Sequence, residues 1–232
     1  MTLTFEESVE FWEALALVDP YWSIFPRSEK GSWEDRLDHF YDTGVTQVHN
    51  MMRPMSRHLT NGTALDFGCG VGRTTRPLHR YYNNVIGYDS SPSMIKVAKE
   101  NTVEENVSYT VGTYDDIPRE SVEFLLSVVT LQHIPSKWLL TVINRLLGAL
   151  KPGGFAVFQI PDSETDRDSK TPLMDFSITC TPVETVIPVV KHAGCFVMRI
   201  EKDMMLGMHW HNYTYYIGKG PGYTTSFHGC WD

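Results

Sequence analysis

The chain has 232 residues, 42% of them hydrophobic and 21% charged, with a formal net charge of −8 at pH 7. These values are typical of a globular domain with a sizeable core, and the negative charge argues against a protein that tracks a nucleic-acid backbone. No apolar run approaches the roughly 20 residues that span a membrane and the four cysteines have no paired spacing, so we expect a cytoplasmic protein with free thiols.

The first 60 residues carry helical signals and many aromatic side chains. Apolar residues at helical spacing predict a helix over 5–18 that ends at Asp19-Pro20. An aromatic loop follows, and further helical segments are predicted over 33–40 and 43–58, the second capped by Asp42 or Thr43. We expect 1–60 to be a helical segment and 61–232 to be the main domain.

From residue 63 onward, strand and helix signals alternate, which predicts parallel βαβ units. The predicted strands cover 63–67, 85–88, 107–111, 124–131 and 155–160, and the predicted helices cover 72–82, 92–100, 136–150 and 181–193. Ser91 and Ser136 are the expected caps of the second and third helices. A polar loop over 161–170 and an antiparallel hairpin of 195–202 with 212–218 complete a doubly wound, mostly parallel α/β sheet of about seven strands.

The segment Ala64-Leu-Asp66-Phe-Gly68-Cys-Gly70-Val-Gly72-Arg73 reads as a buried strand that enters a glycine-rich turn and then a helix. A second strand ends in Asp89, and this combination is how α/β sheets bind an adenosine-containing cofactor. Arg73 stands where the dinucleotide pattern has Gly or Ala, and the Asp66 carboxylate would repel a pyrophosphate. Asp66 suits an ammonium group instead, such as the methionine end of S-adenosylmethionine (SAM).

These residues resemble a known family. Asp66 to Gly72 is similar to motif I of class I SAM-dependent methyltransferases, and Asp89 resembles the acid of their second motif. Residues 112–118 resemble the loop beside the adenine, 131–135 the turn after the fourth strand, and 150–154 the turn before the fifth. The resemblance covers the middle and C-terminal two-thirds of the chain. It implies SAM as cofactor, S-adenosylhomocysteine as product, and a lid formed by the N-terminal helices.

The expected cofactor contacts follow from this pattern. Gly68, Gly70 and Gly72 let the backbone approach the cofactor closely. Asp66 should accept a hydrogen bond from the methionine ammonium, and Asp89 should accept from both ribose hydroxyls. Arg73 either receives the methionine carboxylate at the start of a helix or forms a surface salt bridge. The remaining predicted cofactor residues are Ser90 and Met94 beside the adenine, Thr113, Tyr114 and Asp115 in its loop, with Asp115 the choice for the amino group, and Leu131 after the fourth strand.

His133 follows the fourth strand, where open α/β sheets bind their ligands. It can act as a general base toward an acceptor hydroxyl or serve only as a wall of the site. Tyr21, Trp22 and Phe40 either face the cavity as part of the lid or pack against the sheet, and Trp210 is expected to line the acceptor pocket. His209 and His211 share a strand face, but no further ligand accompanies them, so we expect no metal.

The resemblance predicts transfer of a methyl group from SAM to an oxygen or nitrogen atom of a small molecule. Two alternatives remain open, a peptide or protein methyltransferase with an open groove and a SAM-binding module without turnover. We expect no nucleic-acid or membrane partner. The sequence does not identify the acceptor, distinguish O- from N-methylation or define the oligomeric state.

Overall fold

The computed structural model describes residues 4–25, 33–56, 61–164, 178–203 and 210–220. Its helices are α1 (Phe5–Val18), α2 (Pro20–Ile24), α3 (Leu37–Met52), α4 (Pro92–Glu100), α5 (Ser136–Ala149) and α6 (Val183–His192). Its strands are β1 (Thr63–Phe67), β2 (Asn84–Asp89), β3 (Val107–Val111), β4 (Val122–Ser127), β5 (Leu150–Glu164), β6 (Cys195–Asp203) and β7 (Trp210–Lys219). Short 3₁₀ turns, η1 to η5, cover Glu34–Arg36, Arg53–Met55, Arg76–Arg80, Tyr114–Asp116 and Leu131–His133.

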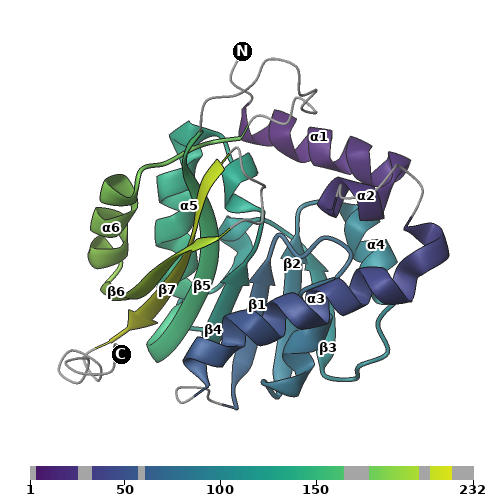
Figure 1. Cartoon of the computed structure of the whole chain (residues 1–232), viewed down its shortest axis with the longest axis horizontal. Coiled ribbons are helices and arrows are strands. Elements are labelled where there is room, and N and C mark those ends of the chain that lie inside the picture. The colour runs from purple at the N-terminus through teal and green to yellow at the C-terminus, as the bar shows by residue number, and fades with distance from the viewer. Residues whose placement is uncertain (1–3, 26–32, 57–60, 165–177, 204–209, 221–232) are drawn as a thin grey trace.

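The seven strands form one sheet in the order β3-β2-β1-β4-β5-β7-β6. Strands β1 to β5 are parallel, and β7 runs antiparallel to both of its neighbours. The strand order reverses between β1 and β4, which is where doubly wound sheets open a crevice at the carboxyl ends of their strands. This sheet confirms the predicted fold class. In Figure 1, α1 lies across the top of the molecule, above the upper ends of β1 and β2.

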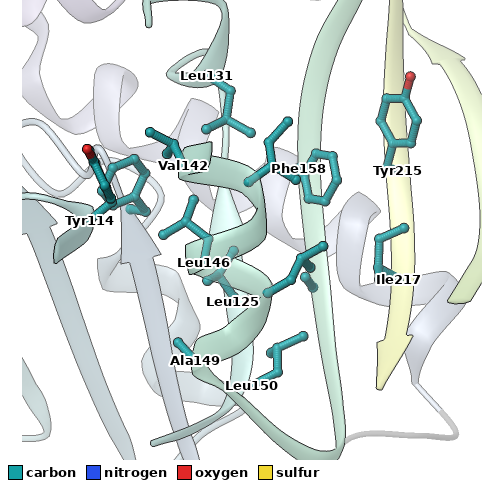
Figure 2. Packing of buried hydrophobic residues seen from close by; sticks show 14 of the residues in the cluster. Tyr114, Leu125, Leu131, Val142, Leu146, Ala149, Leu150, Phe158, Tyr215 and Ile217 are labelled. Atoms are coloured by element: carbon teal, nitrogen blue, oxygen red, sulfur yellow. The ribbon is translucent and has the colours of Figure 1, made fainter. Parts of the chain in front are cut away.

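Helices cover both faces of the sheet. Strand residues such as Leu125 and Phe158 point to the face covered by α5 and α6, where Leu146 packs against them (Figure 2). On the other face, Met52 of α3 packs against Phe124. The N-terminal helices therefore share a core with the sheet, while a boundary at residue 60 stays a prediction. No helix of the described residues is both long enough and apolar enough to cross a membrane.

Three predicted helical segments were wrong in extent. The segments 33–40 and 43–58 meet in one helix, α3, whose N-cap is Arg36 without a side-chain hydrogen bond. Nothing interrupts its backbone, because its buried positions continue at helical spacing through Phe40, Gly44 and Val48. The predicted helix 72–82 is a series of turns ending in η3, because Pro77 lacks the N–H that a continuing helix needs.

Strand ends and one cap also differ from the prediction. β4 ends at Ser127, since Val129 adopts a φ of 56° that no strand tolerates. β5 extends through Glu164 with an irregular register after Pro161, so the first residues of the predicted loop 161–170 are strand. The N-cap of α5 is Pro135 and not Ser136. By contrast, Ser91 caps α4 as predicted, accepting from the Met94 N–H at 3.1 Å.

Candidate functional site

A pocket lies at the carboxyl ends of β1, β2 and β4 and is roofed by α1. Its floor is the glycine turn that follows β1, and one bank is formed by Asp89 and Ser90 after β2. The opposite bank is formed by residues 128–130 and by His133 after β4. The pocket therefore occupies the switch point of the sheet, where the sequence placed the cofactor site.

The glycine turn has a backbone that other residues adopt only with strain. Gly68, Gly70 and Gly72 have φ values of 72°, 52° and 83°. A Cβ on Gly68 would also lie 2.1 Å from the Thr130 side chain, which donates to the Gly68 carbonyl at 3.2 Å. Gly68 and Gly70 line the pocket. Thus Gly68 allows the turn after β1 to lie close to Thr130, which follows β4.

Asp66 is 1% exposed and lies beneath the turn, outside the set of residues that line the pocket. Its Oδ2 accepts hydrogen bonds from the hydroxyls of Thr74 at 2.9 Å and Thr75 at 2.7 Å. Burial raises the pKa of Asp66 to about 6, although the two hydroxyls act in the opposite direction. In this arrangement the acid holds the far end of the turn, and its contact with a methionine ammonium stays a prediction.

Arg73 lines the pocket but is only 4% exposed. Its guanidinium donates to Gln47 Oε1 at 2.7 Å and to Thr43 Oγ1 at 3.3 Å, both on α3. Its Cζ also lies 4.8 Å from the centre of the Phe25 ring. Arg73 is therefore not a surface residue, and it fastens α3 to the glycine turn beside the pocket.

Asp89 ends β2 as predicted and lines the pocket. Its Oδ2 accepts from the Gly70 N–H at 2.8 Å, and its Oδ1 accepts from the Ser91 N–H at 2.9 Å. Burial raises the pKa of Asp89, and the two N–H groups oppose this shift. The carboxylate thus joins the glycine turn to the start of α4 at the edge of the pocket, and its contact with ribose hydroxyls stays a prediction.

The structure separates the remaining predicted cofactor residues into two groups. Ser90, Met94 and Thr113 line the pocket. Tyr114 is buried against Phe5 with ring centres 5.3 Å apart, and Leu131 belongs to the core beneath α5. Asp115 is exposed to solvent outside the pocket, because Thr113 caps the short turn η4 and directs the following acids outward.

His133 lines the pocket as predicted. Its ring lies 4.6 Å from the ring of Trp12 in α1, and its Nε2 lies 3.1 Å from the Gln132 side-chain nitrogen. Burial lowers the pKa of His133 to about 3, so the imidazole is neutral at pH 7. A neutral ring can accept or donate a hydrogen bond, but burial opposes the imidazolium that a general base must become.

The predicted lid aromatics do not line this pocket. Tyr21 and Phe40 are buried against each other with ring centres 5.3 Å apart, and Trp22 also packs in this N-terminal cluster. The roof is formed instead by Phe5, Ser8, Val9 and Trp12 of α1, together with Ser23 and Ile24. The spacing of the four α1 residues places them on one helix face. The sequence shows the apolar stripe of α1, but it does not show which surface of the protein the stripe packs against.

The described residues contain no group of three or more His, Cys, Asp or Glu side chains that could hold a metal ion. His211 lies with its Nδ1 3.2 Å from Ser163 Oγ, across the β5–β7 pairing. His209 and the Trp210 side chain lie outside the described residues, so the predicted contact of Trp210 with an acceptor stays a prediction.

The fold and the pocket define a doubly wound α/β protein with a site for an adenosine-containing cofactor. Residues 64–154 match the methyltransferase domain family. This match confirms the predicted resemblance of residues 64–154 to class I SAM-dependent methyltransferases. The match covers β1 to the start of β5 and includes the glycine turn, Asp89 and His133.

Individual relatives agree with this assignment. The chain is 28% identical over 153 residues to a ubiquinone biosynthesis O-methyltransferase of Bradyrhizobium diazoefficiens, covering 65% of this chain and 56% of that protein. It is 31% identical over 106 residues to a trans-aconitate 2-methyltransferase of Rhizobium rhizogenes, covering 44% and 40%. The chain thus spans about half the length of these curated relatives. The crystal structure of magnesium protoporphyrin IX methyltransferase from Synechocystis with bound S-adenosylhomocysteine has the same fold, with a TM-score of 0.67, 12% identity and coverage of 91% and 97%.

Proposed function

We propose that the protein transfers the methyl group of SAM to an oxygen atom of a small-molecule acceptor and releases S-adenosylhomocysteine. This proposal rests on one observation. The pocket beneath α1 has the glycine turn and Asp89 on one side, and residues 128–130 with the neutral His133 on the other. SAM supplies a methyl group on a sulfonium, which is already a good leaving group. The protein therefore gains most by aligning the two reactants and excluding water.

The residues of the pocket fit SAM. Gly68 and Gly70 line the pocket, and we assign the amino-acid end of the cofactor to this turn. Asp89 keeps acceptor capacity beyond its two backbone contacts, as a carboxylate can accept about four hydrogen bonds. We assign the ribose hydroxyls to Asp89, the adenine to Ser90, Met94 and Thr113, and the methionine carboxylate to the region of Arg73.

The bank around His133 is the proposed acceptor side. Phe5, Val9 and Trp12 on α1 face it from above, so an acceptor here is screened from water. We assign His133 a positioning role, because burial holds its pKa near 3 and disfavours the protonated ring. An acceptor oxygen that is already ionised at neutral pH needs no base. This roofed pocket suits a small molecule better than a peptide lying in an open groove.

The relatives support oxygen as the acceptor atom. The Bradyrhizobium relative is named as an O-methyltransferase of ubiquinone biosynthesis, and the Rhizobium relative as a methyltransferase of trans-aconitate. Because these two relatives act on different acceptors, we propose only that the acceptor of this protein is a small molecule with an oxygen nucleophile.

The test is methyl transfer from radiolabelled SAM to a panel of carboxylic acids, phenols and primary amines. We expect turnover with an oxygen acceptor and none with the amines. His133→Asn should then reduce kcat by less than about tenfold and leave its pH dependence unchanged, whereas loss of a general base costs about 10²- to 10⁴-fold. Turnover of amines alone would refute the oxygen assignment, and a loss of that larger size in a folded variant would make His133 the base.

A further inference from the structure

Helix α1 bridges the two banks of the pocket. On the bank after β4, Ser8 donates to the His133 carbonyl at 3.3 Å, and the ring of Trp12 contacts the His133 ring. On the opposite bank, Glu13 reaches the first turn of α4. Because Phe5, Ser8, Val9 and Trp12 also line the pocket, α1 covers the space that we assign to the cofactor and the acceptor.

The Glu13 carboxylate makes three hydrogen bonds to α4. Its Oε2 accepts from Ser91 Oγ at 2.5 Å and from the Ser93 N–H at 3.2 Å, and its Oε1 accepts from Ser93 Oγ at 2.6 Å. Burial tends to raise the pKa of Glu13, but the hydrogen bonds from Ser91 and Ser93 outweigh it and lower the pKa. The carboxylate is therefore charged at neutral pH. Charged acceptors at the start of a helix are also stabilised by the helix dipole.

The same contacts connect α1 to the cofactor side of the pocket. Ser91 donates its hydroxyl to Glu13 and its N–H to Asp89, and Asp89 in turn accepts from the Gly70 N–H. A continuous chain of hydrogen bonds therefore runs from the roof helix through the proposed ribose acid to the glycine turn. Glu13 is not itself among the residues that line the pocket.

We infer that Glu13 is a positioning residue that holds α1 closed over the pocket, so that its contacts with Ser91 and Ser93 limit the rate at which cofactor enters and leaves. This inference rests on the proposed function, since it requires SAM to occupy the pocket beneath α1. Movement of α1 away from the sheet would widen the path of a cofactor into the pocket, and Glu13 is the charged contact that opposes this movement on the Asp89 bank.

The inference is tested with Glu13→Ala in the full-length protein. The matched control is Glu10→Ala, which makes the same change at an exposed position of the same helix. Association and dissociation rate constants are measured for radiolabelled SAM and S-adenosylhomocysteine by mixing and by chase with unlabelled ligand. In Glu13→Ala we expect both rate constants to rise about tenfold, which corresponds to about 1.4 kcal/mol, while Kd changes by less than either rate. Glu10→Ala should match the wild type.

Several results would overturn the inference. Rate constants equal to those of Glu10→Ala would show that Glu13 does not hold the roof closed. A faster dissociation without faster association would mean that Glu13 contributes to affinity only. If Glu13→Ala fails to fold, Ser93→Ala removes the 2.6 Å contact and leaves the Ser91 contact and cap in place, so a smaller increase in both rate constants is expected. A wild-type protein that binds neither ligand would refute the proposed function itself, and the inference with it.

Discussion

Gly44→Ala adds one methyl group where α3 meets the glycine turn. A Cβ at this position would lie 1.9 Å from the Arg73 carbonyl oxygen and 2.7 Å from its carbonyl carbon. Ordinary contact at such a position begins near 3.4 Å, so α3 and the turn must separate by about 1.5 Å. The neighbouring atoms belong to the backbone and cannot move aside as a flexible side chain would.

The expected cost follows from two opposing effects. Overpacking of this kind costs about 1–3 kcal/mol, and replacing a helical glycine by alanine returns up to about 1 kcal/mol. We therefore expect the free energy of unfolding to fall by up to about 3 kcal/mol, which lowers Tm by up to about 12 °C in a domain of this size. The displacement also separates Arg73 from Thr43 and Gln47, so we expect SAM affinity to fall.

Gly148→Ala provides the matched control. Gly148 lies in α5, and a Cβ there would meet the Arg119 guanidinium at 3.5 Å, an ordinary contact. This variant gains helix propensity without a clash and should be more stable than the wild type by up to about 1 kcal/mol. Urea unfolding and calorimetric titration with SAM measure both effects. If Gly44→Ala were as stable as Gly148→Ala and bound SAM equally well, the close approach of α3 to the turn would be refuted.

Two further predictions concern the buried carboxylates. Asp89→Ala should weaken SAM binding by about 1.5–3 kcal/mol, the range for a charged hydrogen-bond acceptor, and an unchanged Kd in a folded variant would remove Asp89 from the site. For Asp66, burial raises the folded-state pKa from an ordinary value of 3.8 to about 6. Between these two pH values Asp66 is protonated in the folded protein but ionised in the unfolded chain. Stability from this group therefore falls as pH rises from about 4 to 6, by about 3 kcal/mol. Asp66→Asn keeps an oxygen for the two threonine hydroxyls, so relative to the wild type it should be more stable at pH 7.5 than at pH 4.5. Urea unfolding at the two pH values checks this, and a stability difference between the two proteins that does not change with pH would contradict it.

The parts of the fold that depend on neighbouring residues were predictable from the sequence. β1 has the predicted bounds, and α4 begins after Ser91 with Pro92 in its first turn. In both cases the determinants lie within a few residues, as an apolar run before a glycine or as a cap before a proline. Asp89 was predictable for the same reason, since a carboxylate at the end of a buried strand must face the carboxyl edge of the sheet.

The parts that depend on docking between distant segments were not predictable. Both α1 and α3 carry aromatic residues, and the sequence gives no reason why Trp12 reaches the pocket while Phe40 is fully buried. That difference depends on where each helix contacts the sheet. Gly44 was overlooked, although a glycine on the buried face of an amphipathic helix indicates a close backbone approach. The broken helix after Gly72 was also signalled, by Pro77.

The acids of the two cofactor motifs make hydrogen bonds within the protein that hold the glycine turn. Asp66 binds two threonine hydroxyls and Asp89 binds two backbone N–H groups, so each carboxylate fixes one end of the glycine turn. Leaving such groups without their acceptor costs about 1–3 kcal/mol each. These contacts of the protein's own groups fix the shape of the pocket floor. If ligand binding leaves them in place, entry depends on the roof, where we infer that Glu13 holds α1 on the Asp89 bank.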